Sequence, residues 1–297
     1  HSHTEYSLFD GISRIGELVS HVKEMGQTAL AITDHGVMYG AVYLYKECIK
    51  QGIKPIIGCE IYVTRGSRFD KSGNGKEKLA HLILLAENNE GYQNLIKICS
   101  KAWTEGYYHR PRADHELLEK YHEGLIVTSA CVGGEVPQAI LNGDMDEARK
   151  VIEFYINTFG KDNYFLEIQN HGLPEEAAVR PVLASLAKEY GLGLVATNDF
   201  HYTKKEDARS QEIKLCISTG KTLDDPYHFH FANDEFYCKS GDEMRAILGN
   251  FPGAIENTRV IADRCNVELT FGEHKLPSFD VPEGETAASY LRKLCEK

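Results

Sequence analysis

The stretch GLVATNDFH, residues 193–201, is an apolar run that ends in an acid and a histidine, Asp199 and His201. In a strand, residues i and i+2 point to the same face. Asp199 and His201 are therefore expected to converge on one point, and so are His1 and His3 at the first positions of the chain. Imidazole and carboxylate groups that converge in this way predict a metal-binding site.

A His-x-His pair is weak evidence by itself, because about 0.6 such pairs are expected by chance in a chain of this length and histidine content. His228-Phe229-His230 lies among aromatic residues. We interpret this second pair as part of a loop or strand edge, because no strand followed by an acid leads into it. The residues around each histidine therefore decide whether it is a candidate metal ligand.

Apolar runs rich in Ile, Val and Leu alternate along the chain with segments of helical periodicity. We expect strands at residues 28–33, 55–63, 80–86, 124–129, 164–168 and 193–197, and helices at residues 39–51, 92–103, 144–159, 174–190 and 208–219. One further strand must end near His1 to His3, which makes seven. This alternation predicts an α/β fold with a largely parallel sheet, either open or closed into a barrel.

The residues that could carry chemistry lie at the ends of these strands, where α/β folds place their sites. They follow or end a predicted strand at His35, Glu60, Cys131, Asp199 and His201. His81 is different, since it stands at the start of HLILLA. If the chain turns back through residues 65–78, an antiparallel return brings His81 beside Glu60.

The composition is that of an ordinary globular protein, with 42% hydrophobic and 26% charged residues in a chain of 297. No apolar run is long enough to span a membrane, and no signal-peptide pattern opens the chain. The eight cysteines form no C-x-x-C pair and favour reduced thiols in a cytoplasmic protein. Because the chain begins at His1 without Met, we interpret it as a trimmed fragment.

The net charge of -11 argues against nucleic-acid binding by the protein surface as a whole. A local basic strip at Arg110 and Arg112 could still steer a phosphate backbone, although surface arginines are more often salt-bridge partners. From Pro277, proline, glycine and acids accumulate as in a linker, and a helical pattern then resumes at residues 287–297. We expect one domain over residues 1–276, with residues 277–297 leading into a following region.

Six motifs resemble one known family when they are taken in order. They are HSHTEYSLFDG at 1–11, AITDHG at 31–36, IIGCEIYV at 56–63, HLILLA at 81–86, TSACVGGE at 128–135 and ATNDFHYT at 196–203. Their order and approximate spacing resemble the polymerase and histidinol phosphatase (PHP) domain, and in particular the PHP domains of bacterial DNA polymerase III alpha subunits. GYYHRPR at 106–112, FYCKSGDEM at 236–244 and the tail from Pro277 are similar to the polymerase group rather than to free-standing phosphatases. The resemblance covers essentially the whole chain.

The resemblance implies a distorted seven-stranded β/α barrel with up to three divalent metals at its carboxyl-terminal mouth. The implied ligands, which would also be the catalytic residues, are His1, His3 and Asp199 for one ion, His81 and Cys131 for a second, Asp10, His35 and His201 for a third, and Glu60 as a bridge between the first two. Imidazole, carboxylate and thiolate together favour zinc, with manganese or iron as alternatives, over magnesium.

Each of these residues also has a simpler interpretation. His35 could belong to a turn that caps the next helix, with Asp34 as the capping residue. Cys131 could be a small buried hydrophobe, and His81 a hydrogen-bonded core histidine. Asp10 could be a turn residue beside a glycine.

Several nearby residues leave two interpretations open. His171 could contact phosphate or be a solvated loop histidine. Trp103, Tyr107 and Tyr108 could stack on bases, but packing in a core or domain interface is the preferred interpretation. Cys59 should face away from Glu60 by strand alternation, so we assign it to the core.

For function, the resemblance implies a metal-dependent phosphodiesterase, a 3′–5′ exonuclease that removes misincorporated nucleotides from a DNA 3′ end. Two ions roughly 3.5–4 Å apart can activate water and stabilise charge on a phosphoryl oxygen. The implied partners are DNA, the remainder of a polymerase chain with its palm and thumb, and proofreading or other replisome subunits, with no membrane. The nucleotidyltransferase active site would lie beyond Lys297.

Two alternatives to the exonuclease stay open. One is a structural or docking module that metals stabilise without turnover. The other is a phosphatase of the histidinol phosphate type. The complete ligand set favours catalysis over the first alternative, and the tail after Pro277 argues against the second.

Overall fold

The computed structural model describes residues 1–8, 10–72, 79–273 and 277–296. The chain divides into two units, His1–Val267 and Glu268–Lys297. In the second unit, α11 (Ala287–Cys295) begins at the N-cap Thr286, whose hydroxyl accepts a hydrogen bond from the backbone N–H of Ser289. The last residue of the expected first domain, at position 276, lies outside the described residues. No helix in the described part of the chain is long and apolar enough to cross a membrane.

The first unit is built on a curled sheet with six strands in spatial order and a short seventh at the side. The six are β1 (Ala29–Ile32), β2 (Lys54–Val63), β3 (Ala80–Ala86), β5 (Leu125–Thr128), β6 (Tyr164–Ile168) and β7 (Gly193–Ala196), and β4 (Arg112–Ala113) pairs with β2. All pairs are parallel except β2 with β3 and β3 with β5. The predicted α/β class, the largely parallel sheet and the antiparallel return of β3 are confirmed.

The first residues of the chain join the two ends of this sheet. The backbone N–H of Thr33, just after β1, donates to the Ser2 carbonyl at 3.1 Å, and the N–H of His3 donates to the Phe200 carbonyl, beyond β7, at 2.9 Å. Ser2 and Phe200 form an isolated parallel bridge. The expected strand near His1 to His3 is therefore only one bridge long, but it closes the rim of the sheet at the carboxyl ends of β1 and β7.

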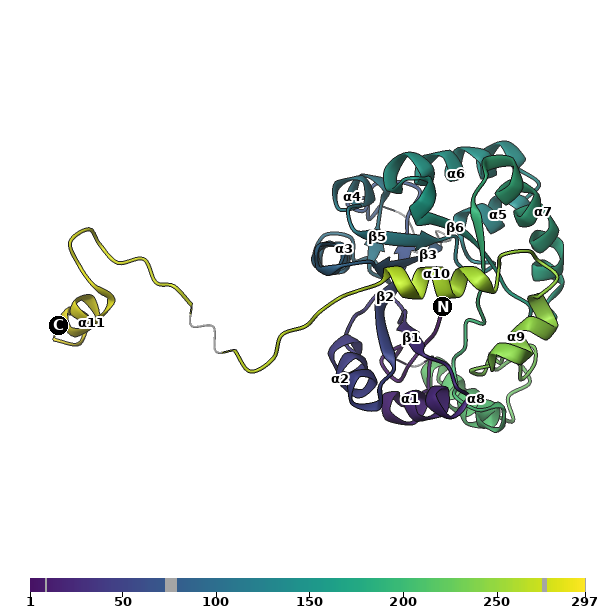
Figure 1. The fold of residues 1–297 in the computed structure, drawn as a ribbon, viewed down its shortest axis with the longest axis horizontal. Helices are drawn as coiled ribbons and strands as arrows, with labels where there is room; N and C mark the ends of the chain where they lie inside the picture. The colour runs from purple at the N-terminus through teal and green to yellow at the C-terminus, as the bar shows by residue number, and fades with distance from the viewer. Residues whose placement is uncertain (9, 73–78, 274–276, 297) are drawn as a thin grey trace. The chain divides into compact units, whose positions relative to one another are not determined.

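Helices surround the outside of the sheet, as Figure 1 shows. They are α1 (Ile15–Glu24), α2 (Ala41–Gln51), α3 (Asn89–Thr104), α4 (His115–Lys120), α5 (Glu135–Leu141), α6 (Met145–Phe159), α7 (Pro174–Tyr190), α8 (Ala208–Thr219), α9 (Gly241–Leu248) and α10 (Glu256–Arg264). Asn88 and Asp144 cap α3 and α6 through side chains that accept backbone N–H groups. The sequence interpretation placed α2, α3, α6, α7 and α8 but did not include α1, α4, α5, α9 and α10.

The apolar core lies on both faces of the sheet, and nine of the ten residues of β2 are buried. One cluster packs α1 and α2 against β1, through residues such as Leu18, Leu44 and Ile32. Another packs Ile261 of α10 against Ile126 and neighbouring strand residues. Helices thus hold the strands from outside, while the carboxyl ends of the parallel strands carry polar side chains.

Candidate metal centre

The nine residues singled out from the sequence lie together at the closed rim of the sheet. Each comes from a segment that the fold brings to that point: the amino-terminal segment, the loops after β1, β5 and β7, and strands β2 and β3. The full set is His1, His3, Asp10, His35, Glu60, His81, Cys131, Asp199 and His201. The structure therefore disperses none of them.

Glu60, in β2, lies at the centre of the group with its side chain 1% exposed. Its carboxylate oxygens lie 3.1 Å from His1 Nε2, 3.5 Å from His3 Nε2 and 2.8 Å from His81 Nδ1, and they contact His35 Nδ1. The antiparallel pairing places His81 opposite Tyr62, two residues from Glu60 in β2. The predicted approach of His81 to Glu60 is confirmed.

Asp199 approaches the same histidines from the opposite side. Its Oδ1 lies 3.1 Å from His1 Nε2 and 3.0 Å from His3 Nε2. The strand geometry expected for Asp199 and His201 is wrong, because β7 ends at Ala196 and Asp199 has a φ of 41°. The left-handed conformation is costly for a residue with a side chain and is often found at functional sites. It turns the Asp199 carboxylate toward the histidines.

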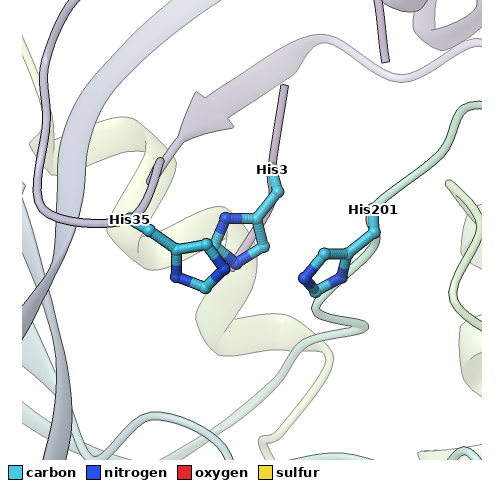
Figure 2. Close-up of side chains that lie close together, drawn as sticks. All are labelled: His3, His35 and His201. Atoms are coloured by element: carbon cyan, nitrogen blue, oxygen red, sulfur yellow. The ribbon is translucent and has the colours of Figure 1, made fainter. Parts of the chain in front are cut away.

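Three imidazole rings from separate segments lie close together (Figure 2). The ring of His3 lies 3.9 Å from that of His35 and 4.4 Å from that of His201, measured between centroids. Asp10 Oδ2 lies 3.0 Å from His35 Nε2 and 3.7 Å from His201 Nε2. Asp10 is therefore part of the cluster rather than only a turn residue.

Cys131 follows β5 and completes the group on the side of His81. Its Sγ lies 3.6 Å from His81 Nδ1 and accepts a hydrogen bond from the backbone N–H of Gly133 at 3.4 Å. Burial raises the pKa of the Cys131 thiol well above its usual value, and the carboxylates of Asp199 and Glu60 raise it further. A bound cation would reverse this effect, because a coordinating thiol is deprotonated.

The ligand-type atoms fall into three groups that are each compact enough to hold an ion. The groups are His1 with His3 and Asp199, Glu60 with His81 and Cys131, and His3 with His35 and His201. The first two agree with the expected division. In the third, His3 stands with His35 and His201, whereas Asp10 was expected there and contacts both of those histidines from the edge.

Six buried side-chain atoms in this cluster have no hydrogen-bond partner. They are His1 Nε2, His3 Nε2, His35 Nδ1, both carboxylate oxygens of Glu60, and Asp199 Oδ1. An unpaired buried polar atom costs about 1–3 kcal/mol, so six such atoms facing one another favour the binding of further ligands. Divalent cations would satisfy all six at once. The mixture of nitrogen, oxygen and sulfur donors fits zinc or a similar first-row metal.

A set of outer hydrogen bonds fixes the orientation of the histidines, as is common around metal ligands. His1 Nδ1 lies 2.8 Å from Glu167 Oε1, and His3 Nδ1 lies 2.9 Å from Ser7 Oγ. The Ser7 hydroxyl in turn donates to Asp34 Oδ1 at 2.7 Å. Each contact leaves the Nε2 atom of the histidine facing the cluster.

Sequence reasoning missed Glu167 and Ser7 and misassigned Asp34. Asp34 accepts hydrogen bonds from the backbone and hydroxyl of Thr4 and from the hydroxyl of Ser7, whereas α2 begins after Gly40 without a side-chain cap. The signal for Glu167 was available, since it is the only acid in the fully buried strand β6. An unpaired carboxylate there would be costly, so a partner was to be expected.

The charges in the cluster are strongly coupled. Although burial opposes protonation, the carboxylates of Asp199, Glu167 and Glu60 hold the pKa of His1 well above its usual value. Burial, together with the neighbouring charges of His35 and His201, lowers the pKa of His3 to about 3. The surrounding histidines lower the pKa of Glu60 and of Asp199 despite burial. His3 is thus neutral, and both carboxylates are ionised, as metal ligands must be.

Several other candidates lie outside the cluster. His171 is neither a phosphate contact nor a solvated residue, because it is 2% exposed and both its ring nitrogens lie within hydrogen-bonding distance of Glu176 Oε1 or the Asn198 carbonyl. Arg112 is also buried, and its guanidinium donates to backbone carbonyls at Gly106, Arg68 and Asp70. Neither can steer DNA from the surface. His228 lies 2.7 Å from Glu212, away from the nine residues.

A cleft of about 1240 Å³ opens onto the cluster, with Asp10, His35 and His81 among its lining residues. Aromatic side chains make up much of its wall, including Trp103 and Tyr107. These two are 40% and 47% exposed, so packing in a core is wrong for both, and packing in a domain interface stays a prediction. The cleft therefore connects the buried cluster to the surface.

Comparison with known proteins places the chain in a family. The PHP domain family matches residues 1–171. The DNA polymerase III subunit alpha of Thermus aquaticus is 47% identical over 99% of this chain, and that of Treponema pallidum is 46% identical over 100%. The chain spans about a quarter of the length of these relatives, 25% and 26% respectively. An amidohydrolase from Chromobacterium violaceum aligns with a TM-score of 0.47 and 15% identity, over 72% of this chain and 95% of its own.

Proposed function

Because the chain belongs to the PHP domain family, we propose that it is a metal-dependent phosphodiesterase that removes nucleotides from the 3′ end of DNA within a DNA polymerase III alpha subunit. The observation that carries this proposal is the group of six unpaired, buried nitrogen and oxygen atoms around Glu60 and Asp199. Divalent cations would satisfy all of these atoms together. The adjoining cleft lets a phosphodiester reach those cations.

The side chains divide the work of holding the ions and the substrate. His1, His3 and Asp199 would hold one ion, and Glu60 would link it to a second at His81 and Cys131. His35 and His201, with Asp10 at their edge, would hold a third. When bound, adjacent divalent ions polarise water and stabilise negative charge on a phosphoryl oxygen. Glu167 and Ser7 keep His1 and His3 in the orientation that this requires.

The partners follow from the relatives rather than from the site. The relatives are replicative polymerase subunits about four times longer than this chain, so we place residues 277–297 at the start of the polymerase region. In that context the substrate is a mispaired primer 3′ end, and the cytoplasm is the compartment. Zinc is the metal we expect from the donor set.

The direct test is degradation of 3′-labelled single-stranded DNA by the zinc-loaded chain and by an Asp199→Asn variant. Asparagine tolerates the left-handed backbone at this position, so the variant should fold while losing a charged ligand. We expect the rate to fall at least about 10³-fold and the zinc content to drop. Equal cleavage by both proteins would contradict the proposal.

The same assay separates the two alternatives. A chain that holds zinc stoichiometrically but cleaves neither DNA nor bis(p-nitrophenyl) phosphate would be a metal-stabilised structural module. A chain that hydrolyses L-histidinol phosphate and leaves DNA intact would be a small-molecule phosphatase. We expect cleavage of DNA and of the diester, with no hydrolysis of histidinol phosphate.

A further inference from the structure

Two aromatic rings on the cleft wall form a flat surface that the chemistry of the metal centre does not use. Trp103, in the last turn of α3, and Tyr107, just beyond the helix, lie parallel with ring centroids 5.2 Å apart and an interplanar angle of 11°. Both line the cleft and are 40% and 47% exposed. We call this pair the stacking shelf. Exposed aromatic rings that are already parallel leave one ring face available to a further planar group.

The stacking shelf is fixed to the loop that carries a candidate metal ligand. The indole Nε1–H of Trp103 donates to the carbonyl of Gly36 at 2.8 Å, and Gly36 directly follows His35. Gly36 has a φ of 63°, and a Cβ at this position would lie 2.7 Å from Pro111, so the loop requires glycine here and packs closely against Pro111. The distance between the stacking shelf and the metal centre is therefore held by the fold.

A cationic side chain also lies on this cleft wall, close to the metal centre. The exposed Arg110 guanidinium lies 5.5 Å from the centroid of the Tyr62 ring. The Tyr62 ring in turn lies 6.1 Å from the ring of His35 and 5.4 Å from that of His81. All four of these residues line the same cleft. The same cleft wall thus carries an aromatic surface, a cation and the candidate metal-binding histidines.

We propose that the stacking shelf binds a base of a single-stranded polynucleotide while its terminal phosphodiester lies at the metal centre and Arg110 contacts a backbone phosphate. This inference rests on the proposed function and adds to it a substrate class and the residues that recognise it. Bases stack on aromatic side chains whatever their sequence, because every base has a π face. Arginine is suited to phosphate oxygens through its planar fork of N–H donors.

This arrangement selects single strands. A base in a duplex is stacked on both faces by its neighbours, so it has no face to offer to Trp103 or Tyr107. A frayed or mispaired 3′ end has unstacked bases and meets no such barrier. The stacking shelf therefore supplies a preference for mispaired ends without any base-specific hydrogen bond.

The test uses the fact that Trp103 is the only tryptophan in the chain. The zinc-loaded chain is titrated with a thymidine hexanucleotide whose linkages are phosphorothioates that resist cleavage, and with an abasic strand of equal length and charge. We expect the thymidine strand to quench Trp103 fluorescence. The abasic strand should bind with a Kd about tenfold higher or more and should cause no quenching. Equal affinity and no quenching with either strand would overturn the proposal.

Substitutions at Tyr107 and Arg110 test which residues bind the oligonucleotide. Tyr107→Ala and Arg110→Gln should each raise KM for the oligonucleotide about tenfold and leave hydrolysis of bis(p-nitrophenyl) phosphate unchanged. Tyr227→Ala is the matched control, since this tyrosine is 87% exposed and does not line the cleft. If both substrates respond equally to Tyr107→Ala, the stacking shelf has no role in recognition. If neither substrate is cleaved but stacking is seen, the proposed function fails and the binding site stands.

Discussion

Two neighbouring regions of the molecule hold fully buried histidines with opposite hydrogen bonding. His171, after β6, has Nδ1 within 2.5 Å of Glu176 Oε1 and Nε2 within 2.7 Å of the Asn198 carbonyl, and its ring stacks on Phe236 at 4.0 Å. His3 is equally buried, but its Nε2 atom has no hydrogen-bond partner. The difference shows that burial alone does not mark a ligand. A buried nitrogen left unpaired among carboxylates is the feature from which we propose one.

The two regions also differ in how their carboxylates are used. Glu176 satisfies one histidine and also accepts the backbone N–H of His171 at 2.6 Å. Glu60 contacts four histidines, and neither of its oxygens accepts a hydrogen bond. The region around His171 is therefore complete with protein groups alone, whereas we propose that cations complete the region around Glu60.

Replacing the central carboxylates should give the largest contrast. Glu60→Gln removes the negative charge at the centre of the candidate ligand groups. We expect loss of bound zinc and a fall in the rate of diester hydrolysis of about 10³-fold or more. Glu176→Gln is the matched control and should retain both. Metal content by mass spectrometry and the rate with bis(p-nitrophenyl) phosphate measure the outcome. If the Glu60→Gln variant retained all of its zinc, the proposed difference between the Glu60 and His171 regions would be contradicted.

Metal removal should destabilise only one of the regions. A ligand present at about 1000 times its Kd stabilises the folded state by about 4 kcal/mol, which for a domain of this size corresponds to roughly 10 °C in Tm. We expect that shift when zinc is removed by a chelator. In Glu60→Gln the chelator should have little effect. A chelator-resistant Tm in the unsubstituted chain would show that the unpaired atoms are satisfied in some other way.

The converse prediction concerns His171. His171→Ala removes the imidazole partner of Glu176 Oε1, and we expect the free energy of unfolding to fall by about 1–3 kcal/mol. Zinc content and the rate per folded molecule should stay the same, because His171 touches none of the nine residues. Urea denaturation measures the first quantity and metal analysis the second. Lost zinc in this variant would mean that the two regions are not independent.

The smallest effect is the pH dependence of zinc affinity. Neighbouring carboxylates hold the pKa values of His1 and His35 well above the usual range, so in the metal-free protein both remain protonated near neutral pH. Zinc must displace these protons, and affinity should therefore rise with pH above 6.5, by about tenfold per pH unit for each proton released. Competition with a chelator between pH 6.5 and 8.5 measures this. A flat profile would contradict the assigned charges.

The sequence predicted the strands of the sheet well because their apolar runs are long and end in polar groups. Strands β3 and β6 have the bounds that were expected, residues 80–86 and 164–168. Helices α7 and α8 do as well, at residues 174–190 and 208–219. The return of β3 could be anticipated because only an antiparallel pairing brings His81 near Glu60. The helices α5 and α9 were missed because they are short, at seven and eight residues, and periodicity needs a longer window.

The site could be predicted as a set of residues but not as a geometry. Its members follow strand ends, and that signal lies in the order of the chain. The left-handed backbone of Asp199 and the passage of the first residues between Thr33 and Phe200 depend on tertiary packing. The hydrogen bonding of His171 also depends on tertiary packing, since this residue follows a strand end just as the candidate metal ligands do. No local pattern distinguishes a histidine that Glu176 will satisfy from one left unpaired.

The most direct measurement of the central claim is anomalous X-ray diffraction at the zinc edge from crystals of the zinc-loaded chain. The account predicts peaks in the cluster about 2.0–2.3 Å from ligand atoms, with Nε2 of His1 and His3 and the carboxylate of Asp199 around one of them. It also predicts none beside His171. Crystals saturated with zinc that show no anomalous density between Glu60 and Asp199 would contradict it.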